Sequence, residues 1–346
     1  MIENNDQRLP LISVVVPVRN EGPFIRRTLE YIAGQDYPAD KLEIFVVDGF
    51  SEDGTREIVL EMSAADSRIK LLDNLVRLSS AGRNIGARAA KGELVIYIDG
   101  HVYIDGDQLL VNTVRLMREK KVEVLSRPQF LDTPDNNFMQ QAISLARKSV
   151  IGHGRDSTIY TVKESYVDPT SSGASYHRNI FDRVGYFDEN FDAAEDLDFN
   201  YRVASAGFKS FTSPELAVYY YPRTSLPGLF KQMKRYGTGR FRFVQKHPET
   251  LSAAMLAPTV LLVTLLGLLV ASFWISIVPF ATIAGAYLLT LLTASFAISA
   301  GCDWRFLPVL PAVFVTIHFG LAWGFLREAI SSLFGRNGER HPEEKL

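Results

Sequence analysis

A long run without charge most constrains what this 346-residue chain can fold into. Leu251–Cys302 contains no Asp, Glu, Lys, Arg or His over 52 residues. As one straight helix this run would be about 78 Å long, whereas the hydrocarbon core of a membrane is about 30 Å thick. Two membrane spans joined by a turn near Trp274–Pro279 therefore fit better than one. A third apolar segment follows at Phe306–Leu326, and a buried hairpin in a soluble core is the less favoured alternative.

The residues that flank this run indicate how the chain meets the membrane. Arg223–Lys246 has seven basic residues and no acidic one, which is typical of a cytosolic flank and also of a surface that touches anionic headgroups. The N-terminus, MIENNDQRLP, lacks the pattern of a signal peptide, so we expect the first 250 residues in the cytosol. The tail after Leu326 also carries four basic residues, Arg327, Arg336, Arg340 and Lys345. The third segment therefore stays open between a full span and a re-entrant or interfacial helix.

Composition narrows the class of protein. The net charge of −2 gives no signature of nucleic-acid binding, and Cys302 is the single cysteine, so no internal disulfide forms. We expect four regions, which are a folded domain at 1–222, a basic juxtamembrane segment at 223–250, a membrane region of two to three helices at 251–330 and a polar tail at 331–346.

Strand-like and helix-like patterns alternate in the first region. Short apolar, β-branched runs predict strands at 11–18, 42–47, 69–72 and 94–98, and amphipathic or small-residue patterns predict helices at 23–33, 55–62 and 79–90. This alternation indicates an α/β fold with a mainly parallel, Rossmann-like sheet and helices on both faces.

Polar clusters follow three of these strands. They are Arg19-Asn20-Glu21, Asp48 and Asp99-Gly100-His101. In open sheets of this kind ligands bind outside the carboxyl ends of the strands, so these clusters are candidates for one site. Neither GxGxxG nor GxxxxGK[ST] follows the first strand, which disfavours dinucleotide dehydrogenases and P-loop NTPases.

Four stretches of the chain carry a resemblance to a known family. VVVPVRNEGPF, EIFVVDGFSEDGT, SAGRNIGARAAKGELVIYIDGH and GYFDENFDAAEDLDFNYRVASAGFK resemble successive signatures of family 2 glycosyltransferases, which have the GT-A fold. YYYPRTSLPGLFKQMKRYGTGR and the membrane tail are most similar to the branch that includes a succinoglycan glucosyltransferase. The resemblance implies an inverting, metal-dependent transfer of sugar from a nucleotide diphosphate, expected to be UDP, to a hydroxyl group.

The resemblance also implies which residues bind the nucleotide. Asp48 would accept a hydrogen bond from the uracil imide, a role that suits an acceptor-only carboxylate, although an Asx-turn would need the same residue. Arg83 and Asn84 would face the cleft or lie on a helix surface. The full set expected to bind the nucleotide is Pro17, Val18, Arg19, Glu21, Asp48, Arg83, Asn84, Asp99 and Gly100.

The expected metal site departs from the family pattern. The family's Asp-x-Asp appears here as Asp99-Gly100-His101, and residues two apart on an extended backbone point the same way. We expect Mn²⁺ or Mg²⁺ at Asp99, with His101 as a direct ligand or one water removed. Imidazole suits transition metals better than it suits Mg²⁺. The alternative for His101 is a polar cap on the strand.

By the same resemblance Asp196 is the general base that takes the proton of the acceptor hydroxyl, and Glu195 supports it. Acids in the first turn of a helix are also explained by the helix dipole. Gln232, Arg235 and Tyr236 resemble the QxxRW motif, with Arg235 near the diphosphate and Tyr236 near the acceptor sugar. A basic surface facing lipid is the alternative for that segment.

Several functions remain open at this level. The favoured one is transfer to a polyprenyl-linked saccharide in bacterial polysaccharide assembly, by a multi-pass protein of the cytoplasmic membrane with its catalytic domain in the cytosol. A polyprenyl-phosphate sugar synthase and a processive synthase are alternatives within the enzyme class. A non-catalytic membrane scaffold that binds a nucleotide sugar is the alternative outside it.

Overall fold

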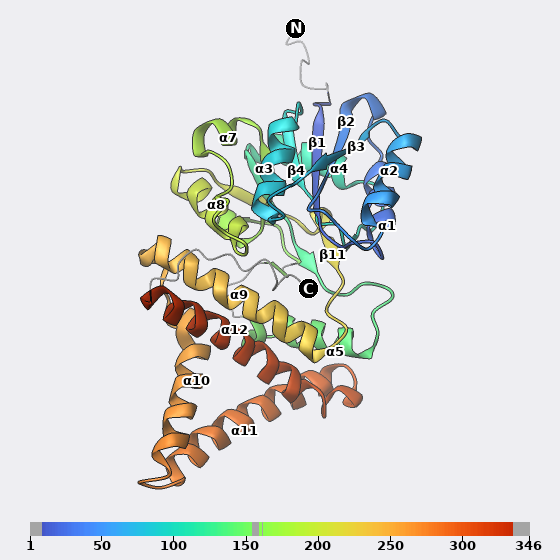
Figure 1. Cartoon of the computed structure of the whole chain (residues 1–346). Helices are drawn as coiled ribbons and strands as arrows, with labels where there is room; N and C mark the ends of the chain where they lie inside the picture. Colours follow the sequence, from blue (N-terminus) through green and yellow to red (C-terminus); the bar gives the residue numbers. More distant parts are fainter. Residues whose placement is uncertain (1–8, 154–158, 161, 335–346) are drawn as a thin grey trace. The chain divides into compact units, whose positions relative to one another are not determined.

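The computed structural model describes residues 9–153, 159–160 and 162–334 (Figure 1). The chain divides into two compact units, one of Met1–Asn136 and Asp156–Tyr221, the other of Asn137–Arg155 and Pro222–Leu346. Most of the N-terminal stretch MIENNDQRLP, and the expected basic tail at Arg336, Arg340 and Lys345, lie outside the described residues.

The first unit is built on an eight-stranded sheet with the order β3-β2-β1-β4-β9-β6-β10-β8, beside a small sheet with the order β5-β11-β7. The strands of the large sheet are β1 (Ile12–Val18), β2 (Leu42–Asp48), β3 (Ile69–Asp73), β4 (Leu94–Tyr97), β6 (Val124–Ser126), β8 (Ser165–Val167), β9 (Gly173–His177) and β10 (Ser210–Thr212). Those of the small sheet are β5 (Val102–Tyr103), β7 (Gln129–Phe130) and β11 (Val218–Tyr220).

The parallel half of the large sheet agrees with the prediction from sequence. β1 pairs in parallel with β2 and β4, and β2 pairs in parallel with β3. The other half is mixed, because β9 runs antiparallel to both of its neighbours, β4 and β6. The helices of this unit are α1 (Ile25–Ala33), α2 (Thr55–Ala65), α3 (Ser79–Ala89), α4 (Leu109–Lys120), α7 (Asn179–Val184) and α8 (Glu195–Ser205).

Two hydrophobic cores lie on the two faces of this sheet. Side chains alternate between the faces of a strand, and in β1 Val14 belongs to the core formed with α1, α2 and α4, whereas Val15 belongs to the core formed with α3, α7 and α8. Because both faces are covered, β1 and β2 read as continuous apolar runs rather than alternating ones. The result is the three-layer α/β/α arrangement expected from the sequence.

Gly86 explains the small residues along α3. A Cβ atom at Gly86 would lie 2.9 Å from Cγ2 of Val15 and closer still to its Cγ1. The glycine therefore lets the backbone of α3 lie directly against β1. This close approach fixes the helix that carries Arg83 relative to the strand end.

The second unit is helical. Its helices are α5 (Phe138–Lys148), α6 (Val150–His153), α9 (Leu226–Lys246), α10 (Ala253–Ala271), α11 (Val278–Gly301) and α12 (Leu310–Leu333). The backbones of α9 and α12 lie in close contact where Gly237 faces the carbonyl of Leu321 and Gly324 faces the carbonyl of Lys234. Arg242 of α9 also pairs with Glu328 of α12, with Nε and Oε1 2.7 Å apart. Most of the basic segment expected at 223–250 is thus the single helix α9.

Three helices, α10, α11 and α12, are long and apolar enough to cross a membrane. The first two are joined within 272–277, close to the turn predicted from the sequence. α12 is the most covered of the three by other parts of the chain, with 44% of its most apolar window buried. All three segments therefore meet the requirements of length and composition for a membrane span.

Candidate functional site

The candidate site of the first unit lies at the carboxyl ends of β1, β2 and β4. Val18 pairs with Asp48 in register, so β1 and β2 end side by side, and Asp99 follows β4 directly. Pro17 is half-buried, Val18 is buried, and Arg19 is half-buried with its Nε covered. The strands thus deliver the polar clusters to one edge of one sheet, as the α/β reading requires.

The loops after β1 and β2 are held together by hydrogen bonds. The amide of Asn20 donates to the Ser51 hydroxyl at 2.8 Å, and the amide of Glu52 donates to Oδ1 of Asn20 at 2.9 Å. The Gly22 amide donates to Asp53 at 2.9 Å, and that carboxylate in turn accepts from Thr55 at 2.5 Å. The two loops therefore form one hydrogen-bonded double loop at the edge of the sheet.

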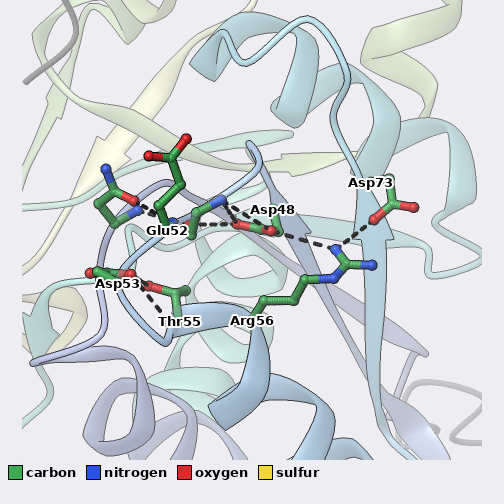
Figure 2. A network of polar contacts seen from close by, with 8 residues as sticks. Asp48, Glu52, Asp53, Thr55, Arg56 and Asp73 are labelled. Carbon is green, nitrogen blue, oxygen red and sulfur yellow. Dashed lines mark hydrogen bonds and ion pairs between the residues drawn. The ribbon is translucent and has the colours of Figure 1, made fainter.

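Asp48 forms hydrogen bonds with this double loop (Figure 2). Its side chain is fully buried, and it accepts a hydrogen bond of 2.6 Å from the Ser51 hydroxyl. Arg56 lies between two carboxylates, 3.5 Å from Asp48 and 2.7 Å from Asp73. Both oxygens of Asp48 thus have partners within the protein, and its contact with a uracil base stays a prediction.

Arg83 joins the end of β4 to the start of α8. Its Nη2 lies 3.2 Å from Oδ1 of Asp99, and its Nε lies 3.5 Å from Oε1 of Glu195. The guanidinium also lies over the rings of Tyr97 and Phe187. A single cation therefore bridges two carboxylates that are far apart in the sequence. Asp99 is the one expected at the nucleotide, and Glu195 is the one expected beside the general base.

Burial alone would raise the pKa of Asp99, but nearby groups outweigh it. The cation of Arg83, together with His101 and the hydroxyl of Tyr220, holds the pKa of Asp99 below its ordinary value. Arg127 adds a further positive charge, and its Nη2 donates to the carbonyl of Tyr97 at the end of β4. Asp99 is thus kept as an anion at the edge of the sheet.

Asp196 has the opposite character. It lies in the first turn of α8 with an exposed side chain, and its Oδ1 accepts from the amide of Leu197 at 2.8 Å. Although the side chain reaches the surface, desolvation by the neighbouring protein and, next, the like charge of Glu195 raise its pKa above the ordinary value, against the cation of Arg83. A carboxylate whose proton affinity is raised is a stronger general base.

The structure places the other predicted residues in three settings. Asn84 is buried, where it donates to the Phe187 carbonyl and accepts from the Phe187 amide, both at 2.9 Å, so it is not brought to the cluster around Asp99. Gly100 is buried between Val18 and Glu21. Gln232, Arg235 and Tyr236 belong to α9 of the second unit, where Gln232 donates weakly to the Tyr236 hydroxyl at 3.4 Å.

A divalent metal fits this site only with a small set of protein ligands. Among the described residues no group of three or more His, Cys, Asp or Glu is arranged to hold a metal. Asp99 and His101 are neighbours with side chains about one-third exposed. One carboxylate and one imidazole suit a metal that takes its remaining ligands from a diphosphate, because Mg²⁺ commonly binds through one or two protein groups plus substrate phosphates.

Sequence reasoning missed several residues of the site. Arg127 lies in a segment without a motif. Tyr220 lies in the quoted stretch YYYPRTSLPGLFKQMKRYGTGR but was assigned no role, and only the fold brings both residues to Asp99. Asp53 and Thr55 could have been found from the sequence, because an Asp two residues before a Thr at a predicted helix start is typical of an Asx-turn.

The fold is an α/β arrangement of the GT-A type, and the site is a cluster of carboxylates and arginines at the ends of its strands. The structure is similar to that of a mannosyltransferase from Pyrobaculum calidifontis, named PcManGT and solved with GDP-Man and Mn²⁺, with a TM-score of 0.62 and 21% identity over 92% of this chain and 88% of that one. The family model of glycosyl transferase family 2 matches residues 13–185. The chain belongs to this family and is a glycosyltransferase.

Curated relatives extend the likeness beyond the matched segment. The succinoglycan biosynthesis protein ExoA of Rhizobium meliloti is 27% identical over 323 residues, which cover 92% of this chain and 94% of that protein. A dolichyl N-acetylglucosaminyl phosphate diacetamidodideoxyglucuronosyltransferase of Methanococcus voltae is 28% identical over 240 residues, 68% of this chain and 74% of that protein. The likeness to ExoA therefore reaches through the helical unit.

Proposed function

We propose that the protein transfers a sugar from a nucleotide diphosphate, with UDP as the expected nucleotide, to a hydroxyl of a lipid-linked saccharide at a membrane. The observation that carries this proposal is the bridge made by Arg83, which places an ionised Asp99 and the Glu195–Asp196 pair in one cluster. Transfer needs positive charge for the leaving diphosphate and a base for the acceptor, and the cluster offers both.

Each side chain then has a role in an inverting displacement. Asp196 removes the proton of the attacking hydroxyl, and Glu195 keeps the proton affinity of Asp196 high. Arg83 lies where it can stabilise negative charge on the diphosphate. Asp99 and His101 would hold a divalent metal, Mn²⁺ or Mg²⁺, and such a metal supplies Lewis-acid stabilisation of the departing diphosphate.

One relative supports a lipid-linked acceptor, and another supports a role in polysaccharide assembly. ExoA is named for succinoglycan biosynthesis, and the Methanococcus voltae protein is named for transfer to a dolichyl-linked sugar. Three helices fit a membrane by length and composition, so we propose a multi-pass protein of the cytoplasmic membrane with the catalytic unit in the cytosol. On this proposal the glycosyltransferase domain is 1–222, with α9 at the membrane surface and the spans within 251–330.

A donor screen tests the proposal. Full-length protein in membranes is supplied with a lipid extract, a panel of UDP-sugars and GDP-mannose, and either Mn²⁺ or Mg²⁺, and the release of nucleoside diphosphate is measured. We expect release with one donor that depends on the saccharide-bearing lipid fraction. Release that needs only polyprenyl phosphate would favour a polyprenyl-phosphate sugar synthase, and a growing polymer would favour a processive synthase. No release with any donor would support the non-catalytic scaffold.

A further inference from the structure

Glu21 reaches the ring of His101 across the site. Oε1 of Glu21 lies 2.9 Å from Nδ1 of His101, although the two residues are 80 positions apart in the chain. The side chains are 20% and 31% exposed respectively. The contact therefore lies at the open edge of the site, next to Asp99, and not in the core.

The residue between Asp99 and His101 makes this contact possible. A Cβ atom at Gly100 would lie 2.7 Å from Cγ1 of Val18 and 3.0 Å from Cγ of Glu21. Any larger residue at this position would occupy the path of the Glu21 side chain. Gly100 thus serves the close approach of Glu21, a reason for the glycine that the motif alone does not give.

Both partners are held on their other sides. The amide of Glu21 donates to the Thr55 hydroxyl at 2.8 Å, and its carbonyl accepts from the amides of Phe24 and Ile25 at 2.9 and 2.8 Å. The ring of His101 makes edge-type contacts with two other rings. The centroid distance is 5.9 Å to Tyr220 and 6.5 Å to Phe24. The direction of the carboxylate and the plane of the imidazole are therefore both set by the fold.

The chemistry of the pair assigns a role to each ring nitrogen. An ionised carboxylate only accepts hydrogen bonds, so Nδ1 of His101 donates to Glu21, and in the neutral imidazole, the form that binds metals, Nε2 then carries the lone pair. Histidines that bind metals commonly donate their second N–H to a carboxylate, which fixes the tautomer and makes the ligand more basic. Glu21 and His101 match this arrangement.

We propose that Glu21 is a positioning residue for the metal, which holds His101 so that Nε2 rather than Nδ1 acts as the ligand beside Asp99. This inference rests on the proposed function, since the metal serves the nucleotide diphosphate. It assigns Glu21 a role different from the nucleoside contact that the family resemblance implies. It also accounts for the imidazole at a position where the family has a carboxylate. In this protein the carboxylate is that of Glu21, and it contacts His101 instead of the metal.

Calorimetry of UDP binding separates the two roles of Glu21. UDP is titrated into full-length detergent-solubilised protein with and without Mn²⁺, which gives a metal-free affinity and the factor by which Mn²⁺ tightens it. The variants are Glu21→Ala, Glu21→Gln, His101→Asp and the double variant Glu21→Ala/His101→Asp. Thermal unfolding of each variant confirms that it is folded.

We expect Glu21→Ala to leave the metal-free affinity for UDP unchanged and to reduce the Mn²⁺ enhancement at least tenfold or abolish it, since loss of an outer partner of a metal ligand typically costs 10–100-fold in metal affinity. Glu21→Gln retains an acceptor oxygen and should keep most of the enhancement. His101→Asp restores a direct carboxylate ligand, so adding Glu21→Ala to it should cause no further loss.

Three results would overturn the inference while leaving the glycosyltransferase reading intact. They are wild-type UDP binding that Mn²⁺ does not enhance, an enhancement that Glu21→Ala leaves unchanged, and an equal fall in metal-free UDP affinity when Glu21→Ala is made in the wild type and in the His101→Asp variant. The last would instead assign Glu21 to the nucleoside. Failure of both UDP and GDP to bind the wild type would count against the proposed function itself, and the inference would fall with it.

Discussion

At the scale of single residues, the site combines two carboxylates with opposite titration behaviour. Asp99 is kept ionised by the charges around it, whereas Asp196 has a raised pKa. Pairs of acidic groups whose environments move their pKa values apart are typical of active sites in which one group binds charge and the other transfers a proton. The arrangement therefore favours an enzyme over a scaffold on physical grounds as well as by family.

Asp196→Asn should reduce kcat by about 10²–10⁴-fold with little change in nucleotide affinity, because it removes the proposed general base and no proposed nucleotide contact. Asp198→Asn, two residues along the same helix, is the matched control. Asp198 is buried and pairs with Arg202 at 3.1 Å, so its loss should cost about 3 kcal/mol of stability and leave the kcat of the folded protein near that of the wild type. Equal kcat values for Asp196→Asn and the wild type would remove Asp196 from the mechanism.

The pH dependence of transfer should report the raised pKa of Asp196. A base must be unprotonated, so kcat/KM is expected to fall as the pH drops through that pKa, which lies above the ordinary value for aspartate. Glu195→Gln removes the neighbouring like charge and should move this acid limb to lower pH. A profile recorded with Glu119→Gln, a surface change on α4, serves as the control and should match the wild type. A limb that stays in place in Glu195→Gln would show that Glu195 does not act on the base.

At the scale of elements, the position of α3 against β1 decides where Arg83 lies. The close approach at Gly86 leaves no room for a side chain beside Val15. Gly86→Ala should therefore destabilise the protein by about 1–3 kcal/mol through overpacking.

The double variant Val15→Ala/Gly86→Ala provides the test of that contact. Removing the methyl groups of Val15 should recover part of the loss, so the two changes together should destabilise less than their sum in thermal unfolding. Strict additivity would mean that the helix does not rest on Val15.

Prediction from sequence succeeded where a local pattern set the structure. The uninterrupted apolar runs of β1, β2 and β4 marked the parallel strands, and their ends marked the polar edge. β9 has the sequence GASYH, which is too short and too rich in small residues to predict a strand. Its antiparallel position between β4 and β6 could therefore not be predicted.

The side-chain partners could not be read from local patterns at all. Asn84 was expected either at the cleft or on a helix surface, and its amide group instead bonds the backbone of Phe187, about a hundred residues away. The contact of Glu21 with His101 depends on the relative height of two strand ends and on Gly100 between them. Such contacts are properties of the packed fold. The polar residues at the strand ends could be predicted from the sequence, whereas the contacts between their side chains could not.

At the scale of the whole molecule, the single cysteine offers a direct reading of topology. Cys302 is exposed in the turn between α11 and α12. If α10 and α11 both span, Cys302 lies on the same side of the membrane as Ser252, which precedes α10, and we expect that side to be cytosolic. A membrane-impermeant maleimide should then label Cys302 in inside-out vesicles and not in intact spheroplasts.

Ser276→Cys in a Cys302→Ser background is the complementary probe, because Ser276 is exposed in the connection between α10 and α11. Its labelling should show the reverse pattern. Labelling of both positions from one side would mean that this helical pair does not cross the bilayer.

Because Arg83 bridges the carboxylates, binding of the sugar donor and protonation of Asp196 should affect each other. On the proposed function Arg83 moves toward the diphosphate of the incoming donor, so it neutralises the carboxylates of Glu195 and Asp196 less, and the proton affinity of Asp196 should rise when the donor binds. Linkage is reciprocal, and a proton on Asp196 must therefore tighten the binding of the donor by the same free energy. Acidification should thus strengthen donor binding over the pH range in which it slows transfer, and the two steps of the cycle are expected to have opposite pH optima.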